Sequence, residues 1–203
     1  MNIRVLILIL FCNALIACSE TNQPAILSSD ATILAFGDSL TYGTGAHKGE
    51  DYPSILSSLT GLKVINAGVP GEISNEGLQR LPSLLDEYQP DLLILIHGGN
   101  DILRKLPRAE LKNNLLAMFD LANKRSIPVV NFGVPEPGLF LKSAETYQQL
   151  VNETDVPIEL KLLPDIIGDK SLKADIAHPN AKGYRKLAEG IFEFLQEKEF
   201  VEN

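Results

Sequence analysis

From residue 31 onward, short apolar runs alternate with longer amphipathic segments, and this alternation constrains the fold more than any other feature of the sequence. Four runs rich in Ile, Leu and Val are bounded by Gly, Pro or Asn, at residues 32–36, 64–67, 92–97 and 128–132, and a weaker fifth run covers 156–160. Continuous apolar runs of this length are typical of parallel strands that are buried on both faces. The sequence therefore predicts a mostly parallel sheet of five strands.

The segments between these runs have the apolar spacing of helices that bury one face. Five such segments are found, at residues 52–59, 73–88, 108–124, 144–151 and 180–197. In the third segment the apolar positions fall on one side of a helix: Leu111, Leu115, Met118, Phe119 and Ala122. Strands that alternate with helices in this way predict a doubly wound α/β fold with right-handed crossovers. A length of 203 residues fits a single domain of this kind.

The charge balance excludes two classes of partner. Acidic residues outnumber basic ones by 26 to 18, which gives a formal net charge of -8. A nucleic-acid backbone and an anionic lipid surface both attract basic proteins, so neither is expected to be the main partner.

The first residues have the pattern of an export signal. A short region with one positive charge, Arg4, precedes the apolar run 5–11, and small residues lead to Cys18. The apolar stretch is too short to span a bilayer comfortably, which favours a signal peptide over the alternative of an uncleaved N-terminal anchor. The sequence Leu15-Ile16-Ala17-Cys18 resembles the lipobox of bacterial lipoproteins, in which cleavage precedes a cysteine that becomes acylated.

This resemblance divides the chain into three parts. Residues 1–17 are expected to be the signal peptide, 18–30 a polar tether that starts at the lipidated Cys18, and 31–203 the folded domain. The protein is then exported and lipid-anchored on the periplasmic face of the envelope. Ser19 after the cysteine favours the outer membrane over the inner one. Because Cys12 is removed and Cys18 carries lipid, no catalytic cysteine and no disulfide remain.

Polar and glycine-rich turns follow three of the predicted strands. They cover residues 37–40, 68–71 and 98–101, and a fourth polar segment, 175–180, precedes the last helix. In open α/β sheets the carboxyl ends of the strands form the edge where ligands bind. We therefore expect these four segments to lie along one edge of the sheet.

Two of these segments supply residues for nucleophilic catalysis. Asp175 and His178 are three residues apart, so a tight turn can bring the carboxylate onto one ring nitrogen and leave the other free as a general base. Ser39 lies in the first of the four segments. His47 has only Glu50 or Asp51 as a neighbouring carboxylate and His97 is followed by glycines, so neither is expected to be catalytic. The alternatives are that Ser39 only caps a helix and that Pro179 only starts one.

The other two segments supply hydrogen-bond donors. Asn100 follows two glycines, which allow the backbone to approach a ligand, and its amide could join the N–H groups of Gly71 and Ser39 in an oxyanion hole. Here too a simpler reading exists. Pro70 and Gly71 could form a plain turn, and Asn100 with Asp101 could form a helix-capping Asx turn.

The four segments together resemble the signature blocks of the GDSL or SGNH hydrolases, in the same order and over nearly the whole domain. The blocks are Gly37-Asp38-Ser39-Leu40, Gly71, Gly98-Gly99-Asn100-Asp101 and Asp175-Ile176-Ala177-His178. Within that family the chain looks most similar to bacterial esterases of the thioesterase I, lysophospholipase L1 and arylesterase type. The resemblance implies a flavodoxin-like three-layer α/β/α fold, no cofactor and no metal. It also implies that Ser39 is the nucleophile, His178 the base, Asp175 its orienting acid, and Gly71, Asn100 and the Ser39 amide the oxyanion hole.

The expected reaction is hydrolysis of a carboxylic ester or thioester through an acyl-enzyme on Ser39, by a monomer that binds a small-molecule acyl substrate. The segment 133–140 shapes the acyl side in such relatives, which makes Leu139 and Phe140 candidate acyl contacts. Three other functions stay open. They are a carbohydrate O-acetyl deacetylase with the same residues, a non-catalytic lipoprotein, and a metal-dependent phosphoesterase, although one His among several acids is a poor ligand set.

Overall fold

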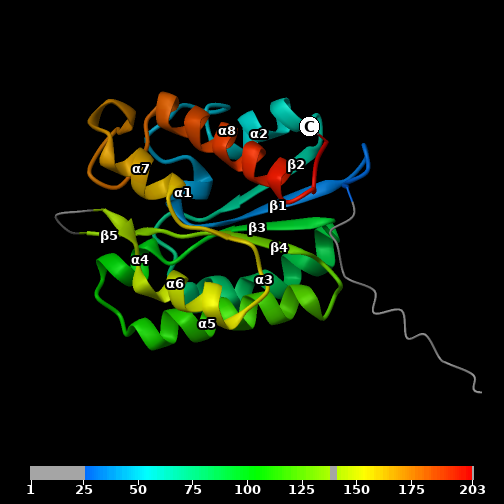
Figure 1. Ribbon diagram of the computed structural model, residues 1–203, viewed down its shortest axis with the longest axis horizontal. Helices are drawn as coiled ribbons and strands as arrows, with labels where there is room; N and C mark the ends of the chain where they lie inside the picture. The colour runs from blue at the N-terminus through cyan, green and yellow to red at the C-terminus, as the bar shows by residue number, and fades with distance from the viewer. Residues whose placement is uncertain (1–25, 138–140, 203) are drawn as a thin grey trace, which may run out of the picture.

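The computed structural model describes residues 26–137 and 141–202, in which helices cover both faces of a central sheet (Figure 1). Cys18, Leu139 and Phe140 lie outside the described residues. The sheet has five strands in the order β2-β1-β3-β4-β7, and every neighbouring pair is parallel. The strands are β1 (Thr32–Gly37), β2 (Lys63–Gly68), β3 (Leu92–Ile96), β4 (Val129–Phe132) and β7 (Ile158–Glu159). The predicted α/β sandwich is confirmed.

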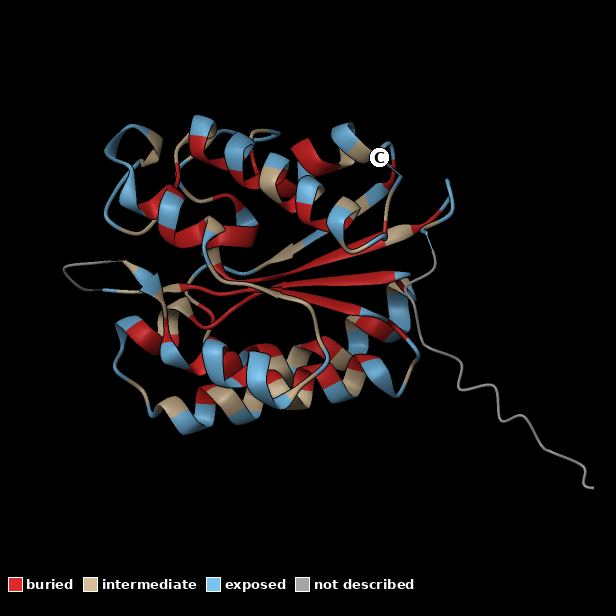
Figure 2. Ribbon diagram, in the orientation of Figure 1, coloured by how far each residue is buried: buried red, intermediate tan, exposed pale blue. Residues whose placement is uncertain are grey.

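The central strands are buried because both of their faces are covered by helices. All five residues of β3 are fully buried, and β4 and most of β1 are buried as well, whereas β2 and β7 at the edges are half-exposed (Figure 2). Leu, Ile, Val and Phe side chains therefore fill the core on both sides of the sheet. Burial of this apolar surface is the main term that stabilises the fold.

Two layers of helices enclose the sheet. The upper layer of Figure 1 contains α1 (Ser39–Tyr42), α2 (Tyr52–Thr60), α7 (Leu162–Gly168) and α8 (Ala181–Glu197). The lower layer contains α3 (Ser74–Tyr88), α4 (Gly99–Leu103), α5 (Arg108–Asn123) and α6 (Glu145–Glu153). Within the layers α2 packs on α8 and α3 packs on α5. None of the described helices is long and apolar enough to span a bilayer.

The predicted strands and long helices are all present, with ends that differ by a few residues. The third strand ends at Ile96, so His97 follows it rather than closing it, and the weak fifth strand shortens to two residues. The short helices α1, α4 and α7 were not predicted. Nor were the 3-10 turn Lys170–Leu172 and the small antiparallel ribbon formed by β5 (Pro135–Glu136) and β6 (Lys142–Ser143).

The described ends of the chain lie at the amino end of the sheet. The N–H of Leu27 donates to the carbonyl of Phe200 over 2.8 Å, just before β1 begins. The turns that follow β1, β2 and β3 lie at the opposite, carboxyl end, on the left of Figure 1. The predicted site residues therefore lie at the end of the sheet opposite Leu27 and Phe200.

Candidate active site

Ser39 is the first residue of α1, directly after β1. The cap of this helix is Asp38, whose Oδ1 accepts a hydrogen bond from the N–H of Leu40 over 3.1 Å. The reading of Ser39 as the helix cap is therefore wrong, and its hydroxyl is left for another partner. As the first helical residue, Ser39 also has an N–H group with no acceptor inside the helix.

Asp175 and His178 lie in the loop before α8. Nδ1 of His178 lies 2.8 Å from Oδ2 and 3.0 Å from Oδ1 of Asp175. Oδ1 also accepts from the N–H groups of Ala177 and His178, over 2.8 and 2.9 Å. The tight turn expected from the three-residue spacing is thus formed, and it fixes the orientation of the imidazole.

The free side of the same ring faces the serine. Nε2 of His178 lies 2.9 Å from Oγ of Ser39. Because a carboxylate only accepts hydrogen bonds, Nδ1 carries the proton that is donated to Asp175. In the neutral ring Nε2 is then an acceptor, so the serine hydroxyl donates to it. A hydroxyl, an imidazole and a carboxylate are joined in the order that nucleophilic catalysis requires.

The carboxyl group of Asp175 is held in its ionised form. Partial burial tends to raise the pKa of Asp175, but hydrogen bonds from the N–H groups of Ala177 and His178 and from the His178 ring outweigh it. The net effect is a pKa below the usual value. The acid therefore remains an acceptor for the imidazole at neutral pH.

The loop that carries His178 is fixed by contacts at both of its ends. The N–H of Ala174 donates to the carbonyl of His178 over 2.9 Å, and Lys173 pairs with Pro179 in an isolated bridge. Asn180 caps α8, accepting from the N–H of Gly183 over 3.1 Å, so Pro179 is not the first helical residue. These contacts set the position of the imidazole before any substrate binds.

The buried Tyr184 of α8 connects the two halves of the site. Its hydroxyl donates to the carbonyl of Thr44 over 2.8 Å, in the loop that follows α1. The same loop is tied to the start of α1, because the N–H of Thr44 donates to the carbonyl of Ser39 over 3.0 Å. The helix behind His178 therefore also holds the segment behind Ser39.

Gly71 lies in the turn after β2, where a left-handed backbone is required. Its φ of +82° favours glycine, and its carbonyl accepts from Nη2 of Arg104 over 2.7 Å. A second hydrogen bond closes the turn, from the N–H of Glu72 to the carbonyl of Val69 over 3.2 Å. Within the described residues the N–H of Gly71 donates to no acceptor.

Asn100 lies in the first turn of α4, and its amide is held between two residues of other segments. Nδ2 donates to the carbonyl of Glu72 over 3.0 Å and lies 3.4 Å from Oδ2 of Asp38. The second distance exceeds the usual range, so one N–H is only weakly engaged. Asp38 is itself buried, and burial raises the pKa of its carboxyl against hydrogen bonds that lower it.

Asp101 lies in α4, but its carboxylate accepts hydrogen bonds at the start of α3 rather than capping its own helix. Oδ2 of Asp101 accepts from the N–H of Ser74 over 2.8 Å, and Oδ1 accepts from the hydroxyl of Ser74 over 2.6 Å. Ser74 is the first residue of α3, so this buried acid joins the α4 turn to the helix that follows the Gly71 turn. The alternative reading of Asn100 and Asp101 as a cap for their own helix is not supported.

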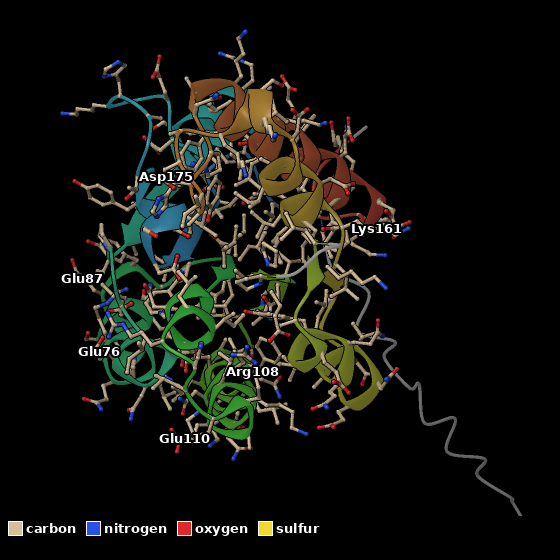
Figure 3. The ribbon with its side chains drawn as sticks, turned by 90° about the vertical axis from the view of Figure 1, so that its left-hand side faces the viewer. Glu76, Glu87, Arg108, Glu110, Lys161 and Asp175 are labelled. Carbon is tan, nitrogen blue, oxygen red and sulfur yellow. The ribbon has the colours of Figure 1, made fainter. Side chains whose placement is uncertain are left out.

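The structure thus brings Ser39, Asp175 and His178 into contact. Gly71, in the turn after β2, and Asn100, in the first turn of α4, lie at the same end of the sheet. Figure 3 views this end of the molecule and labels Asp175. Two residues near the site, Glu72 and Arg80, were not predicted, and His97 was considered only as a histidine without a catalytic role. No group of three or more His, Cys, Asp or Glu side chains is placed for metal binding in the described part of the chain.

A hollow of about 1030 Å³ lies at the other end of the molecule and does not contain these residues. It is lined by Leu27, Asp91, Pro128, Pro157 and Phe200, which precede the strands or lie near the chain ends.

Comparison with known proteins gives a consistent result. Residues 35–186 match the model of the GDSL-like Lipase/Acylhydrolase family. The chain is 28% identical over 204 residues to the arylesterase of Vibrio mimicus, which covers 95% of this chain and 98% of that protein. It is 30% identical over 180 residues to thioesterase 1/protease 1/lysophospholipase L1 of Escherichia coli K12, with 81% and 83% covered. The crystal structure of TesA superposes with a TM-score of 0.74 at 26% identity, covering 82% of this chain and 99% of that one.

Proposed function

Because the chain belongs to the GDSL-like Lipase/Acylhydrolase family and is a hydrolase of ester bonds, we propose that it acts through an acyl-enzyme on Ser39. The observation that carries this proposal is the pair of contacts made by His178, 2.9 Å to the serine oxygen and 2.8 Å to the Asp175 carboxylate. Fold alone would not support it, because one fold hosts many activities.

In the first step Ser39 Oγ attacks the carbonyl carbon of the substrate. Nε2 of His178 takes the hydroxyl proton, and the ring becomes positively charged. Asp175, kept ionised by its hydrogen bonds, stabilises that charge and prevents the ring from rotating. The protonated His178 then gives its proton to the leaving alcohol or thiol as the carbon–oxygen or carbon–sulfur bond breaks.

The negative charge that develops on the carbonyl oxygen needs donors that are already in place. We assign this role to the N–H groups of Ser39 and Gly71 and to the Asn100 amide, whose weakly engaged N–H is available to a substrate oxygen. Preorganised donors of this kind stabilise the transition state more than the ground state.

In the second step water hydrolyses the acyl-enzyme. His178 removes a proton from the water, which attacks the acyl carbon, and the proton passes to Ser39 Oγ as the ester bond breaks. The products are a carboxylic acid and the free enzyme, so the cycle needs no cofactor.

The substrate class that we propose is small carboxylic esters and thioesters with an apolar group next to the carbonyl. Large apolar side chains are exposed on the segments that carry Ser39, Asn100 and His178. Tyr42 ends α1, Leu103 ends α4 with 53% of its surface exposed, and Ile176, between Asp175 and His178, is 88% exposed. Leu139 and Phe140 remain proposed acyl contacts. The names of the relatives, an arylesterase and a thioesterase, support both bond types.

Hydrolysis of p-nitrophenyl acetate and butyrate tests the assignment. Ser39→Ala and His178→Ala should each lower kcat by about 10⁴-fold or more, because the nucleophile and its base act as a unit. Near-native turnover by either folded variant would refute the proposed mechanism. Parallel rates with an acyl thioester then decide which bond type is preferred.

We also propose that the chain is exported and anchored through a lipid on Cys18, as a monomer on the periplasmic face. Support comes from the lipobox-like Leu15-Ile16-Ala17-Cys18. Detergent-phase partition of the native protein compared with Cys18→Ser tests this. Equal partition of both proteins into water would refute it.

A further inference from the structure

Glu72 follows Gly71 directly and is a buried acid held on two sides. Its side chain is 6% exposed. Nε of Arg80 donates to Oε1 over 2.8 Å and Nη2 donates to Oε2 over 2.7 Å. Nε2 of His97 lies 3.1 Å from Oε2. A two-point contact of guanidinium with carboxylate is both strong and directional, so the acid has one fixed position.

Arg80 and His97 are in turn fixed by their own surroundings. The Arg80 guanidinium lies 4.3 Å above the ring centre of Phe36 and donates to the carbonyl of Ala67 over 3.0 Å. His97 is fully buried, and its carbonyl accepts from the hydroxyl of Tyr147 over 2.6 Å. The clamp on Glu72 is therefore anchored in the core.

The His97 ring occupies space that is free because residue 77 is a glycine. A Cβ at Gly77, on the facing side of α3, would lie 2.4 Å from Nε2 of His97, which a real side chain would not allow. Since the carboxylate of Glu72 only accepts, Nε2 carries the proton. Nδ1 of His97 has no partner among the described residues. The ring acts as a one-sided donor to Glu72.

The backbone of Glu72 touches both proposed donors of the oxyanion hole that come from outside α1. Glu72 is joined by its peptide bond to Gly71, whose N–H is the first of these donors. Its carbonyl accepts from Nδ2 of Asn100 over 3.0 Å, which orients the second donor. Movement of Glu72 would thus shift two donors at once.

We infer that Glu72, clamped by Arg80 and His97, is a positioning residue that sets the geometry of the oxyanion hole. It touches no substrate in this role. The three side chains come from the turn after β2, from α3 and from the end of β3. The inference rests on the proposed function, because it takes Gly71 and Asn100 as the oxyanion donors.

Steady-state hydrolysis of p-nitrophenyl butyrate by Glu72→Gln separates positioning from mere folding. Gln has the same size but cannot accept a charged two-point contact, so the residue that follows Gly71 is held less firmly. Loss of a whole donor lowers kcat by about 10²–10³-fold, and a displaced one should lower it by about 10-fold or more. KM should change by less than about threefold, because the donors act on the transition state.

Arg80→Lys, alone and combined with Glu72→Gln, tests whether Arg80 and Glu72 act through the same contact. Lys keeps the positive charge but cannot make the two-point contact of a guanidinium, so Arg80→Lys should lower kcat by a smaller factor than Glu72→Gln does. The double variant should be no worse than Glu72→Gln, since both changes release one clamp. Arg80→Lys also keeps the inference testable if Glu72→Gln does not fold. Asp86→Asn is the matched control, because it removes an exposed carboxylate–arginine pair, with Arg125 at 2.8 Å, from the far end of the same helix.

The outcomes distinguish this inference from the proposed function. Folded Glu72→Gln and Arg80→Lys variants with kcat within about threefold of native would overturn it, as would a loss confined to KM. If those variants are near native while Ser39→Ala is inactive, only the positioning role fails. If Ser39→Ala itself retains turnover, the proposed function fails. A slower reaction of Glu72→Gln with a fluorophosphonate, which also places an oxygen in the hole, would support the inference.

Discussion

The hydroxyl of Ser39 donates to Nε2 of His178 over 2.9 Å, and this contact joins the first turn after β1 to the loop before the last helix. Nε2 can accept because Nδ1 of the same ring gives its proton to Asp175. The contact of Nδ1 with Asp175 therefore decides whether Nε2 is free to accept the proton of Ser39.

Asp175→Asn should impair catalysis without unfolding the protein. An amide in this place can donate to Nδ1 and so favour the tautomer in which Nε2 holds the proton and cannot act as a base. In a serine protease the corresponding change costs about 10⁴-fold in kcat, and we expect at least about 100-fold here, because this acid is half exposed. Asp165→Asn, an exposed acid of α7, is the control. Steady-state kinetics that show equal turnover for both variants would contradict the role of Asp175.

Asn100→Ala should lower kcat by about 10²–10³-fold with little change in KM, because it removes one donor to the oxyanion. It also leaves the carbonyl of Glu72 without its side-chain partner. Asn123→Ala, at the end of α5, removes an exposed amide from the other end of the molecule and should have native kinetics. A rise in KM alone would show that Asn100 binds substrate rather than the transition state.

Asp101→Ala should destabilise the fold. The buried Ser74 would lose the acceptor of both its N–H and its hydroxyl, at the start of α3. Hydrogen bonds to a charged acceptor are worth about 1.5–3 kcal/mol each, so the loss of two should lower the free energy of unfolding by about 3–6 kcal/mol. Urea unfolding measures this. Asp120→Asn, which removes an exposed pair with Lys124, should change stability by less than about 0.5 kcal/mol.

The acid Glu72 should make stability depend on pH below pH 4.5. Burial raises its pKa, but the hydrogen bonds from Arg80 and His97 and their charges lower it further, to about 2 against an ordinary value of 4.5. A folded pKa below the unfolded one stabilises the protein fully above pH 4.5, and this contribution is lost as pH falls toward 2. The free energy of unfolding of native protein and Glu72→Gln should therefore converge over that range. Constant separation down to pH 2.5 would show that Glu72 is not clamped as an anion.

Much of the fold could be predicted, because the strands of a parallel sheet are buried on both faces and so appear as unbroken apolar runs. The run that became β3 is the clearest example, with five fully buried residues. The helices α1 and α4 were missed because four or five residues do not complete an apolar repeat. The ribbon of β5 and β6 was missed because two-residue strands carry no alternation.

The candidate site was predicted where its residues stand together in short segments. Asp175 and His178 are three residues apart, and the structure shows their contact directly. Glu72 and His97 are 25 residues apart, and only the pairing of β3 beside β1 and the packing of α3 bring them together. The sequence contains a partial signal. A Glu directly after a turn glycine and a Gly inside a predicted helix, Gly77, both suggest a close contact, but neither shows which residue makes that contact.

Covalent labelling of the native protein with a fluorophosphonate, followed by mass spectrometry of peptides, tests the central assignment most directly. We expect a single adduct on Ser39, no adduct in Ser39→Ala, and slow labelling in His178→Ala, because the imidazole activates the hydroxyl. An adduct on another residue, or undiminished hydrolysis of p-nitrophenyl butyrate with Ser39 unlabelled, would contradict the account.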